Sequence, residues 1–383
     1  MSERTVIGWD IGGAHAKACL LQGGEVLDVA QWPCALWMGM DRLDAVLHAA
    51  RQRWTGLAAA QHAVTMTGEM VDLFTDREDG VRKIAAELAR ALPASDPARP
   101  GDGHGAVHFF AGDAGWCRDA EVPALWNAIA SANWLATARH AAQRIGTGLL
   151  VDIGSTTTDL IAFRNGRILT GSRTDAQRLA SGELVYHGVV RTPLCAVAHR
   201  IDWRGEPHNV MNELFATSAD VYRLTGELNP AHDLHPSADN AAKDPDATRQ
   251  RLARMIGLDG RDGSPDDWLD FARSWRAVQV AVLGGEMRRV MEAHGLARDA
   301  VIVSAGCGDF LVPDVVASAS AGAPESWPAR RHVAYGRDVA RAHASTGHAA
   351  VQDWAQVCAP CVAVATLFDM DPSVCGSSRS AAA

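Results

Sequence analysis

The sequence predicts an α/β protein of two lobes built on one plan, each with a mixed sheet flanked by helices. Three observations predict this fold. First, an apolar run over residues 5–11 contains Asp10 and leads into a glycine turn. Second, the same pattern of apolar run, aspartate and glycine returns at residues 149–159. Third, apolar residues at helical spacing lie between these two segments and after the second. A chain of 383 residues is also typical of two domains.

The first lobe is expected to contain strands and then helices. Glycine turns divide its opening into three strands, over residues 5–11, 16–21 and 26–30. Helical spacing of apolar residues follows over residues 41–60, 81–93 and 119–144. Residues 94–105 are rich in Pro, Asp and Gly, so we expect them to form a surface loop.

The second lobe begins by repeating the first. An offset of 142 residues places Asp10 on Asp152, Gly12 on Gly154 and Gly24 on Gly166. The tripeptide Asp-Ile-Gly is short enough to recur by chance, but the hairpin signal Asn165-Gly166 extends the match. The repeat therefore predicts two lobes of common design.

Four further segments follow the repeat. They are a polar surface insertion over 228–267, a helix over 268–295, a strand with a glycine turn over 301–311, and a closing helix over 349–368. The predicted boundaries are 1–147 for lobe I, which the C-terminal helix at 340–368 completes, and 148–339 for lobe II. Residues 376–383 are expected to be a disordered tail.

Composition excludes several classes of function. The net charge is −9 and no basic stretch stands out, so nucleic acid is not an expected partner. The polar N-terminus lacks the pattern of a signal peptide, and no apolar run is long enough to span a membrane. We expect a cytoplasmic protein that binds small molecules; the sequence does not indicate an oligomeric state.

The eight cysteines show no framework spacing and are expected to be reduced thiols. Cys358 and Cys361 form a CxxC pair, which can be a redox motif or half of a zinc site. A zinc site needs two more ligands, and no second pair with matching spacing exists. We interpret both cysteines as core or surface thiols.

An aspartate at a strand end followed by a glycine turn suits phosphate chemistry. Its carboxylate can hold Mg2+, and the glycines let backbone N–H groups approach phosphate oxygens. Asp10 and Asp152 are therefore the predicted metal ligands, although both can simply be turn-forming residues. The phosphate- and substrate-binding candidates are Gly12, Gly13, His15, Gly154, Ser155, Thr156, Thr157, Arg191, Gly306 and Gly308.

Three loops in fixed order carry a family resemblance. They read Asp10-Ile-Gly-Gly, Asp152-Ile-Gly-Ser-Thr-Thr-Thr-Asp and Ser304-Ala-Gly-Cys-Gly. Their order resembles the two phosphate loops and the adenosine loop of the actin–hexokinase superfamily. The resemblance implies a two-lobed, ribonuclease H-like α/β fold with the ligand in a cleft between the lobes.

Longer stretches resemble the hydantoinase/oxoprolinase branch of that superfamily, including condensing enzymes of methanofuran biosynthesis and their bacterial counterparts in tetrahydromethanopterin-linked one-carbon metabolism. These stretches are Val6–Lys17, Met66–Asp72, Phe110–Asp113, Ala132–Trp134, Gly182–Tyr186, Gly188–Pro193 and Asn212–Thr217. The resemblance implies a transferase that joins an aminomethyl-furan methyl diphosphate to the phenol of a glutamyl-tyramine or tyrosine acceptor. Pyrophosphate leaves, and Mg2+ is the implied cofactor.

The catalytic candidates follow from this reaction. Lys17 would neutralise charge on the leaving diphosphate, and a general base would deprotonate the phenol. Glu69, Asp113 and Glu183 are the candidate bases, with His15 behind them, and the sequence does not choose among them. Two alternatives remain: an ATP-dependent kinase or oxoprolinase-like hydrolase, and a non-enzymatic, actin-like ATP-binding protein.

Each candidate also has a structural interpretation. Lys17 can be a solvated strand residue, and His15 a packed turn residue. Glu69 and Asp72 would share one face if their segment is helical, but the segment also resembles a capped helix start. Arg191 suits an oxyanion because its fork can bond two oxygens, but it can equally form a surface salt bridge.

Overall fold

The computed structural model describes residues 4–92, 107–296, 300–321, 331–344 and 347–375. The chain divides into two compact units, which we describe separately. Unit 1 comprises Met1–Gly146, Asn165–Ile168 and Ala334–Ala383, and unit 2 comprises Thr147–Arg164 and Leu169–Val333. The loop predicted at 94–105 and the tail predicted at 376–383 lie outside the described residues.

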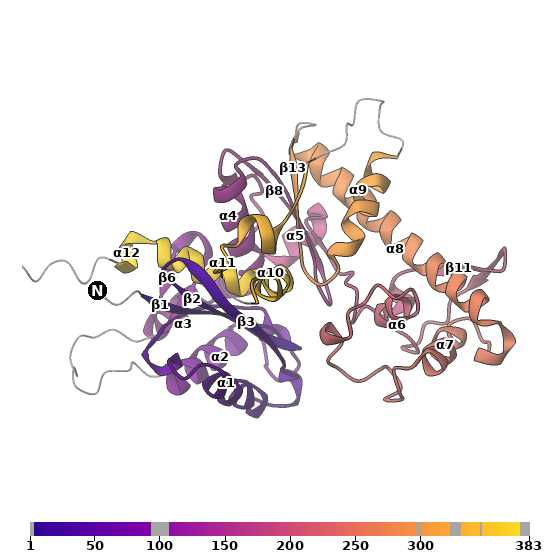
Figure 1. The fold of residues 1–383 in the computed structure, drawn as a ribbon, viewed down its shortest axis with the longest axis horizontal. Coiled ribbons are helices and arrows are strands. Elements are labelled where there is room, and N and C mark those ends of the chain that lie inside the picture. The colour runs from indigo at the N-terminus through magenta and orange to yellow at the C-terminus, as the bar shows by residue number, and fades with distance from the viewer. Residues whose placement is uncertain (1–3, 93–106, 297–299, 322–330, 345–346, 376–383) are drawn as a thin grey trace, which may run out of the picture. The chain divides into compact units, whose positions relative to one another are not determined.

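Unit 1 is built on a six-stranded mixed sheet in the order β3-β2-β1-β4-β5-β6 (Figure 1). Strands β1 to β3 form an antiparallel meander, β4 and β5 run parallel to β1, and β6 runs antiparallel to β5. The three predicted opening strands are confirmed. The strands are β1 Thr5–Ile11, β2 His15–Gln22, β3 Glu25–Pro33, β4 Gln61–Met66, β5 Val107–Phe110 and β6 Trp116–Cys117.

The helices of unit 1 differ from the predicted ranges where local chemistry ends or starts them. Helix α2 begins at Arg77, earlier than predicted, because the Asp76 side chain accepts a hydrogen bond from Asp79 N–H. The helix predicted over 119–144 is two helices, separated where Ser131 has φ +50°. The helices are α1 Asp41–Arg53, α2 Arg77–Ala91, α3 Val122–Ile129, α4 Asn133–Ile145, α10 His348–Val357, α11 Ala359–Met370 and α12 Pro372–Cys375.

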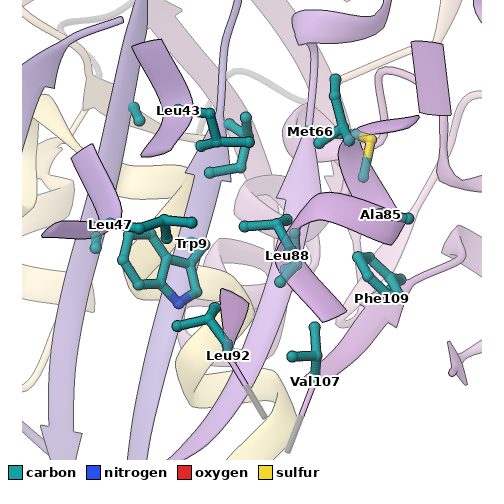
Figure 2. Close-up of a cluster of buried hydrophobic side chains, with 14 of the residues drawn as sticks. Trp9, Leu43, Leu47, Met66, Ala85, Leu88, Leu92, Val107 and Phe109 are labelled. Atoms are coloured by element: carbon teal, nitrogen blue, oxygen red, sulfur yellow. The ribbon is translucent and has the colours of Figure 1, made fainter. Parts of the chain in front are cut away.

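One face of the unit 1 sheet packs on α1 and α2. Because side chains alternate along a strand, Ile7, Trp9 and Ile11 of β1 share that face and are fully buried. Figure 2 shows Trp9 among leucines of both helices, including Leu47 and Leu88. Burying one such leucine contributes roughly 1.5–3 kcal/mol. This layer therefore fixes the strand that ends at Asp10.

The other face of β1 packs closely on α11. A Cβ at Gly8 would lie 2.1 Å from the carbonyl oxygen of Cys361, so only glycine permits this approach. Cys358 and Cys361 are both fully buried there, and the Cys361 thiol donates to the carbonyl of Cys358. The CxxC pair is thus part of the core. Of the two interpretations given above, core thiols or surface thiols, the first describes both cysteines.

Unit 2 repeats the central arrangement of unit 1. Its sheet has the order β10-β8-β7-β13-β14, with β7 and β8 forming an antiparallel hairpin and β13 parallel to β7. This is the relationship of β1, β2 and β4, so the predicted α/β fold of two related mixed sheets flanked by helices is confirmed. The strands of unit 2 are β7 Gly148–Ile153, β8 Thr158–Arg164, β10 Leu184–Val185, β13 Val301–Ala305 and β14 His332–Ala334, with a separate hairpin of β11 Arg200–Trp203 and β12 Glu206–Asn209. The two-residue strand β9, Arg167–Ile168, belongs to unit 1.

The predicted polar insertion over 228–267 is more structured than the sequence indicated. It contains the ten-residue helix α7, whose Arg251 is fully buried. Arg251 Nε donates to Asp220 of α6 (Ser218–Leu224) at 2.7 Å, and this ion pair attaches the insertion to α6. Arg251 Nη1 donates to Asp239, within the insertion, at 3.1 Å. The helices of unit 2 are α5 Asp175–Ser181, α6 Ser218–Leu224, α7 Pro245–Arg254, α8 Pro265–Ala293 and α9 Val312–Ser320.

Within the described ranges, no single helix has the length and apolarity needed to cross a membrane. Among the residues that the structure describes, only α10 and α11 taken together are long and apolar enough to span a membrane. These two helices are bent by 100° at their junction.

Candidate functional site

The first candidate phosphate loop is the turn between β1 and β2. Gly12 N–H donates to the carbonyl of His15 at 2.9 Å, which closes the turn. Asp10 and Lys17 are partners across the hairpin, and Lys17 Nζ lies 3.9 Å from Asp10 Oδ2. Asp10 is only 4% exposed, so a buried carboxylate sits beside a cation at the base of this loop.

Two neighbouring segments hold the first loop in place. Leu36 N–H donates to the carbonyl of Gly13 at 3.0 Å, and Thr67 N–H donates to that of Ile11 at 2.9 Å. A Cβ at Gly13 would lie 2.7 Å from Val71 Cγ1. His15 is 7% exposed, which favours its packed-turn role over a donor to ligand.

Glu69 lies in the segment that follows β4, within the short 3-10 helix Gly68–Met70. It is 1% exposed, and its Oε1 accepts from Ser131 Oγ at 2.7 Å and from Arg77 at 3.1 Å. Its Oε2 is buried without a hydrogen-bond partner among the described residues. Burial raises the pKa of Glu69, against the opposing effects of Ser131 and Arg77. This carboxyl is therefore poised to accept a proton.

The proposed shared face of Glu69 and Asp72 does not form. The helical turn ends at Met70, and Asp72 is exposed while Glu69 is buried. Gly80 of α2 packs against the Glu69 backbone, since a Cβ there would lie 2.5 Å from the Glu69 carbonyl oxygen. Tertiary packing of α2, rather than a capped helix start, determines this segment.

Asp113 lies beyond the end of β5 and is engaged by α4. Its carboxylate pairs with Arg139, which also donates to the carbonyl of Gly112 at 2.8 Å. The Asp113 side chain is 60% exposed. Asp113 is therefore exposed and ion-paired, whereas Glu69 is buried.

The second candidate phosphate loop repeats the geometry of the first. Gly154 N–H donates to the carbonyl of Thr157 at 2.8 Å, and Asp152 faces Asp159 across the β7–β8 hairpin. The hydrogen bond and the cross-strand pair both occur 142 residues after their counterparts in unit 1. Ser155 Oγ is buried with no hydrogen-bond partner among the described residues, so it can still donate to a ligand.

The segment after β10 packs onto this loop. Arg191 N–H donates to the carbonyl of Ser155 at 2.9 Å, and a Cβ at Gly188 would lie 2.4 Å from the backbone nitrogen of Thr156. Burial lowers the pKa of Arg191, although the neighbouring Tyr186 opposes the shift. The structure thus brings the Arg191 backbone next to Ser155, and an oxyanion-binding role for its side chain stays a prediction.

The turn after β13 also packs against the second loop. Gly308 N–H donates to the carbonyl of Ile153 at 2.8 Å. Gly306 has φ +87°, and a Cβ there would lie 2.2 Å from that same carbonyl oxygen and 2.6 Å from Asp152 Oδ1. Glycine is required at position 306 by both conformation and space.

Arg178 is a residue of this region that the sequence did not single out. It is 3% exposed and pairs with Asp159 and Asp175. Burial raises the pKa of Asp159, and the Arg178 charge opposes that rise. In sequence Arg178 resembles a solvated residue of a short helix; only the packing of α5 against β8 directs it to Asp159.

Glu183 makes structural hydrogen bonds within unit 2 and does not lie in either the second loop or the Gly306 turn. Its carboxylate accepts from Thr170 and Ser181 at 2.7 Å and contacts His294 Nε2 at 2.8 Å. Burial alone would raise the pKa of Glu183, but these hydrogen bonds outweigh it and leave the pKa below its ordinary value. These three partners, Thr170, Ser181 and His294, lie outside the two glycine turns.

The donor set fits Mg2+ held mainly by the ligand. Among the described residues, no group of three His, Cys, Asp or Glu side chains is placed to hold a metal ion. Mg2+ commonly takes one or two carboxylates together with water and substrate phosphates. The Asp10 and Asp152 carboxylates at strand ends, each beside a glycine turn, suit that mode of binding.

Comparison with known proteins identifies the family. A sequence model described as hydantoinase/oxoprolinase matches residues 61–341, which is most of the chain. The chain belongs to the hydantoinase/oxoprolinase family. The matched range includes Glu69, the second loop and the Gly306 turn. The first loop lies before the start of the matched range.

Two curated relatives share one name. The chain is 26% identical over 313 residues to the (4-{4-[2-(gamma-L-glutamylamino)ethyl]phenoxymethyl}furan-2-yl)methanamine synthase of Methanocaldococcus jannaschii, covering 81% of this chain and 88% of that protein. It is 27% identical over 168 residues to the synthase of that name from Methanococcus vannielii, covering 44% of this chain and 74% of that one.

Solved structures give more distant likenesses. A ROK family glucokinase from Streptomyces griseus, in complex with glucose and AMPPNP, has a TM-score of 0.47 and 14% identity, with 95% of this chain and 98% of that chain covered. An activator of 2-hydroxyisocaproyl-CoA dehydratase from Clostridium difficile, with bound ADPNP, has a TM-score of 0.45 and 11% identity, with 99% and 98% covered. The fold assignment of this family member rests on its strand order instead.

Proposed function

We propose that the chain is an Mg2+-dependent transferase that joins an aminomethyl-furan methyl diphosphate to the phenol of a glutamyl-tyramine or tyrosine acceptor. The similarity to the Methanocaldococcus jannaschii synthase over 81% of the chain carries this proposal. That protein's name describes a phenoxymethyl-furan, an aryl ether. Two glycine turns beside strand-end aspartates supply the diphosphate-binding parts that such an ether synthesis needs.

In the proposed reaction, the phenol oxygen attacks the methylene carbon attached to the furan. The carbon–oxygen bond to the diphosphate breaks, its electron pair leaves with pyrophosphate, and the phenol proton passes to a base. Bound Mg2+ would neutralise charge on the leaving diphosphate. Lys17 would add a positive charge beside Asp10, and backbone N–H groups of the first glycine turn would orient the phosphates.

Glu69 is the base that the geometry supports best. It has a buried oxygen without a partner, a raised pKa and a place beside the first glycine turn. Asp113 is exposed and paired with Arg139, and Glu183 is held by three hydrogen-bonding partners. We therefore assign proton removal to Glu69, with Ser131 and Arg77 fixing the orientation of its carboxyl group.

The family match favours a second candidate, an ATP-dependent hydrolase of the hydantoinase/oxoprolinase type. One experiment separates the two. Purified protein with Mg2+ receives the furan diphosphate with and without the phenol acceptor, and in parallel ATP with and without the acceptor. Pyrophosphate release that needs the acceptor and no ATP supports the transferase. ADP formation without pyrophosphate release would replace the transferase with a kinase or hydrolase.

A further inference from the structure

Large apolar side chains are exposed around the first glycine turn. Trp37 is 39% exposed, Met38 62%, Met70 54% and Leu73 37%. We call these four residues the apolar rim. They come from two short segments, one after β3 and one after β4, which are far apart in the sequence.

Backbone contacts place both segments on the same turn. Leu36, which starts the first segment, donates its N–H to the carbonyl of Gly13 at 3.0 Å. Val71 of the second segment would touch a Cβ at Gly13 at 2.7 Å. The segments also meet each other, because a Cβ at Gly68 would lie 3.0 Å from Leu36 Cδ2. The two segments that carry the apolar rim therefore both pack against the first glycine turn and against each other.

The concentration of these side chains is not general to unit 1. Of the large apolar side chains exposed among the described residues of unit 1, all but Met370 belong to the apolar rim. Single exposed apolar residues are normal, but a cluster beside a polar turn indicates a ligand with an apolar part. The turn itself offers N–H groups, Asp10 and Lys17, so the expected ligand is amphipathic.

We propose that the apolar rim binds the aromatic ring of the phenol acceptor. This inference rests on the proposed function. Glu69 can take the phenol proton only if the phenol oxygen lies beside it, and Met70 is the next residue in the chain. Methionine sulfur and a tryptophan face both make favourable contacts with a six-membered aromatic ring. The acceptor is therefore an aryl compound recognised by its ring as well as by its hydroxyl.

Steady-state kinetics of serine variants test this assignment. Met38→Ser and Met70→Ser are made singly and together, and Met370→Ser, a methionine 61% exposed on α11, is the matched control. The double variant is expected to raise the KM for the acceptor about tenfold, because apolar contact area is lost. Its KM for the furan diphosphate should stay within about twofold of wild type. Equal changes in both constants, or no change, would overturn the proposal.

A binding measurement keeps this test separate from the reaction itself. The ring protons of γ-glutamyl-tyramine are followed by NMR during titration with wild-type and variant protein, with no diphosphate present. Binding by wild type and Met370→Ser that the double variant loses supports the apolar rim, even where no ether forms. Absence of binding by wild type overturns it. Sedimentation showing a dimer that the double variant abolishes would also overturn it, because the occupant would be a second copy of the chain.

Discussion

Lys17 Nζ lies 3.9 Å from Asp10 Oδ2 across the hairpin of unit 1, whereas the equivalent partner of Asp152 in unit 2 is Asp159. The two hairpins share strand register and turn hydrogen bond, yet their cross-strand partners carry opposite charges. A diphosphate needs positive charge, so the hairpins are not interchangeable.

The first prediction concerns Lys17. Replacing it with methionine keeps most of its packing and removes its charge, so kcat for pyrophosphate release should fall about 100-fold. Lys17→Arg should recover part of the loss because it restores a cation. Thermal melting serves as the folding control, and a Lys17→Met protein that melts normally and turns over at the wild-type rate would exclude Lys17 from catalysis.

The pH dependence of turnover should report Glu69. Its pKa lies above the ordinary value of 4.5, and the base must be deprotonated to act. As the pH is lowered, kcat/KM should therefore decrease with a midpoint above pH 4.5. This decrease should be absent in Glu69→Gln. That variant keeps an acceptor for Ser131 and Arg77 and should lose about 100- to 10,000-fold in kcat. An unchanged acid limb in Glu69→Gln would assign the base elsewhere.

Two glycines provide a matched pair of stability tests. Gly306→Ala forces a side chain into φ +87° and against the Ile153 carbonyl, so it should destabilise unit 2 by about 2 kcal/mol or more. Gly285→Ala, in α8 with open space around it, should stabilise by about 0.5–1 kcal/mol. Urea unfolding measures both. Equal effects would mean that the Gly306 turn tolerates a side chain.

Helix α7 offers a buried and an exposed ion pair on one element. Arg251 and Asp220 are fully buried, whereas the Asp246 side chain that pairs with Arg249 is 90% exposed. Asp220→Ala should cost about 3–5 kcal/mol because it removes the fully buried carboxylate that pairs with Arg251 Nε. Asp246→Ala should cost about 1 kcal/mol or less. If chemical denaturation finds the two costs alike, the insertion is not anchored through Arg251.

Glu183 should contribute to acid unfolding. Its pKa is lowered in the folded state, so its stabilisation is present above the ordinary value of 4.5 and is lost as pH falls through the folded pKa. Wild-type stability should therefore decline below pH 4.5 more steeply than that of Glu183→Gln. Parallel declines in thermal melts across this range would contradict the hydrogen-bonding role of this carboxylate.

Local signals made the hairpins predictable. A strand, a glycine turn and a second strand are determined by residues close in sequence, so the repeat of Asp10 at Asp152 identified two related sheets. The order of the loops identified the Gly306 turn, but its close contact with Asp152 is seen only in the structure. The metal- and phosphate-binding roles of the two loops stay predictions, because only a bound ligand can test them.

Long-range packing was not predictable. Ser131 and Arg77 reach Glu69 only because α2 and the break before α4 meet it in space, and neither position carries a motif. For the same reason, the face that Glu69 and Asp72 would share in a helix does not form. Charged residues such as Arg251 look solvated in sequence, and only the fold shows which of them are buried.

The approach of Gly8 to Cys361 has a consequence for the order in which the polypeptide matures on the ribosome. Helix α11 covers β1, β2 and β4, so one face of the first-synthesised sheet has no partner until residue 370 has been made. Unit 2 is complete by Val333 and can form earlier. Unit 1 can therefore be completed only after the whole of unit 2 has been synthesised, in contrast to the usual N-terminal-first order of domain folding.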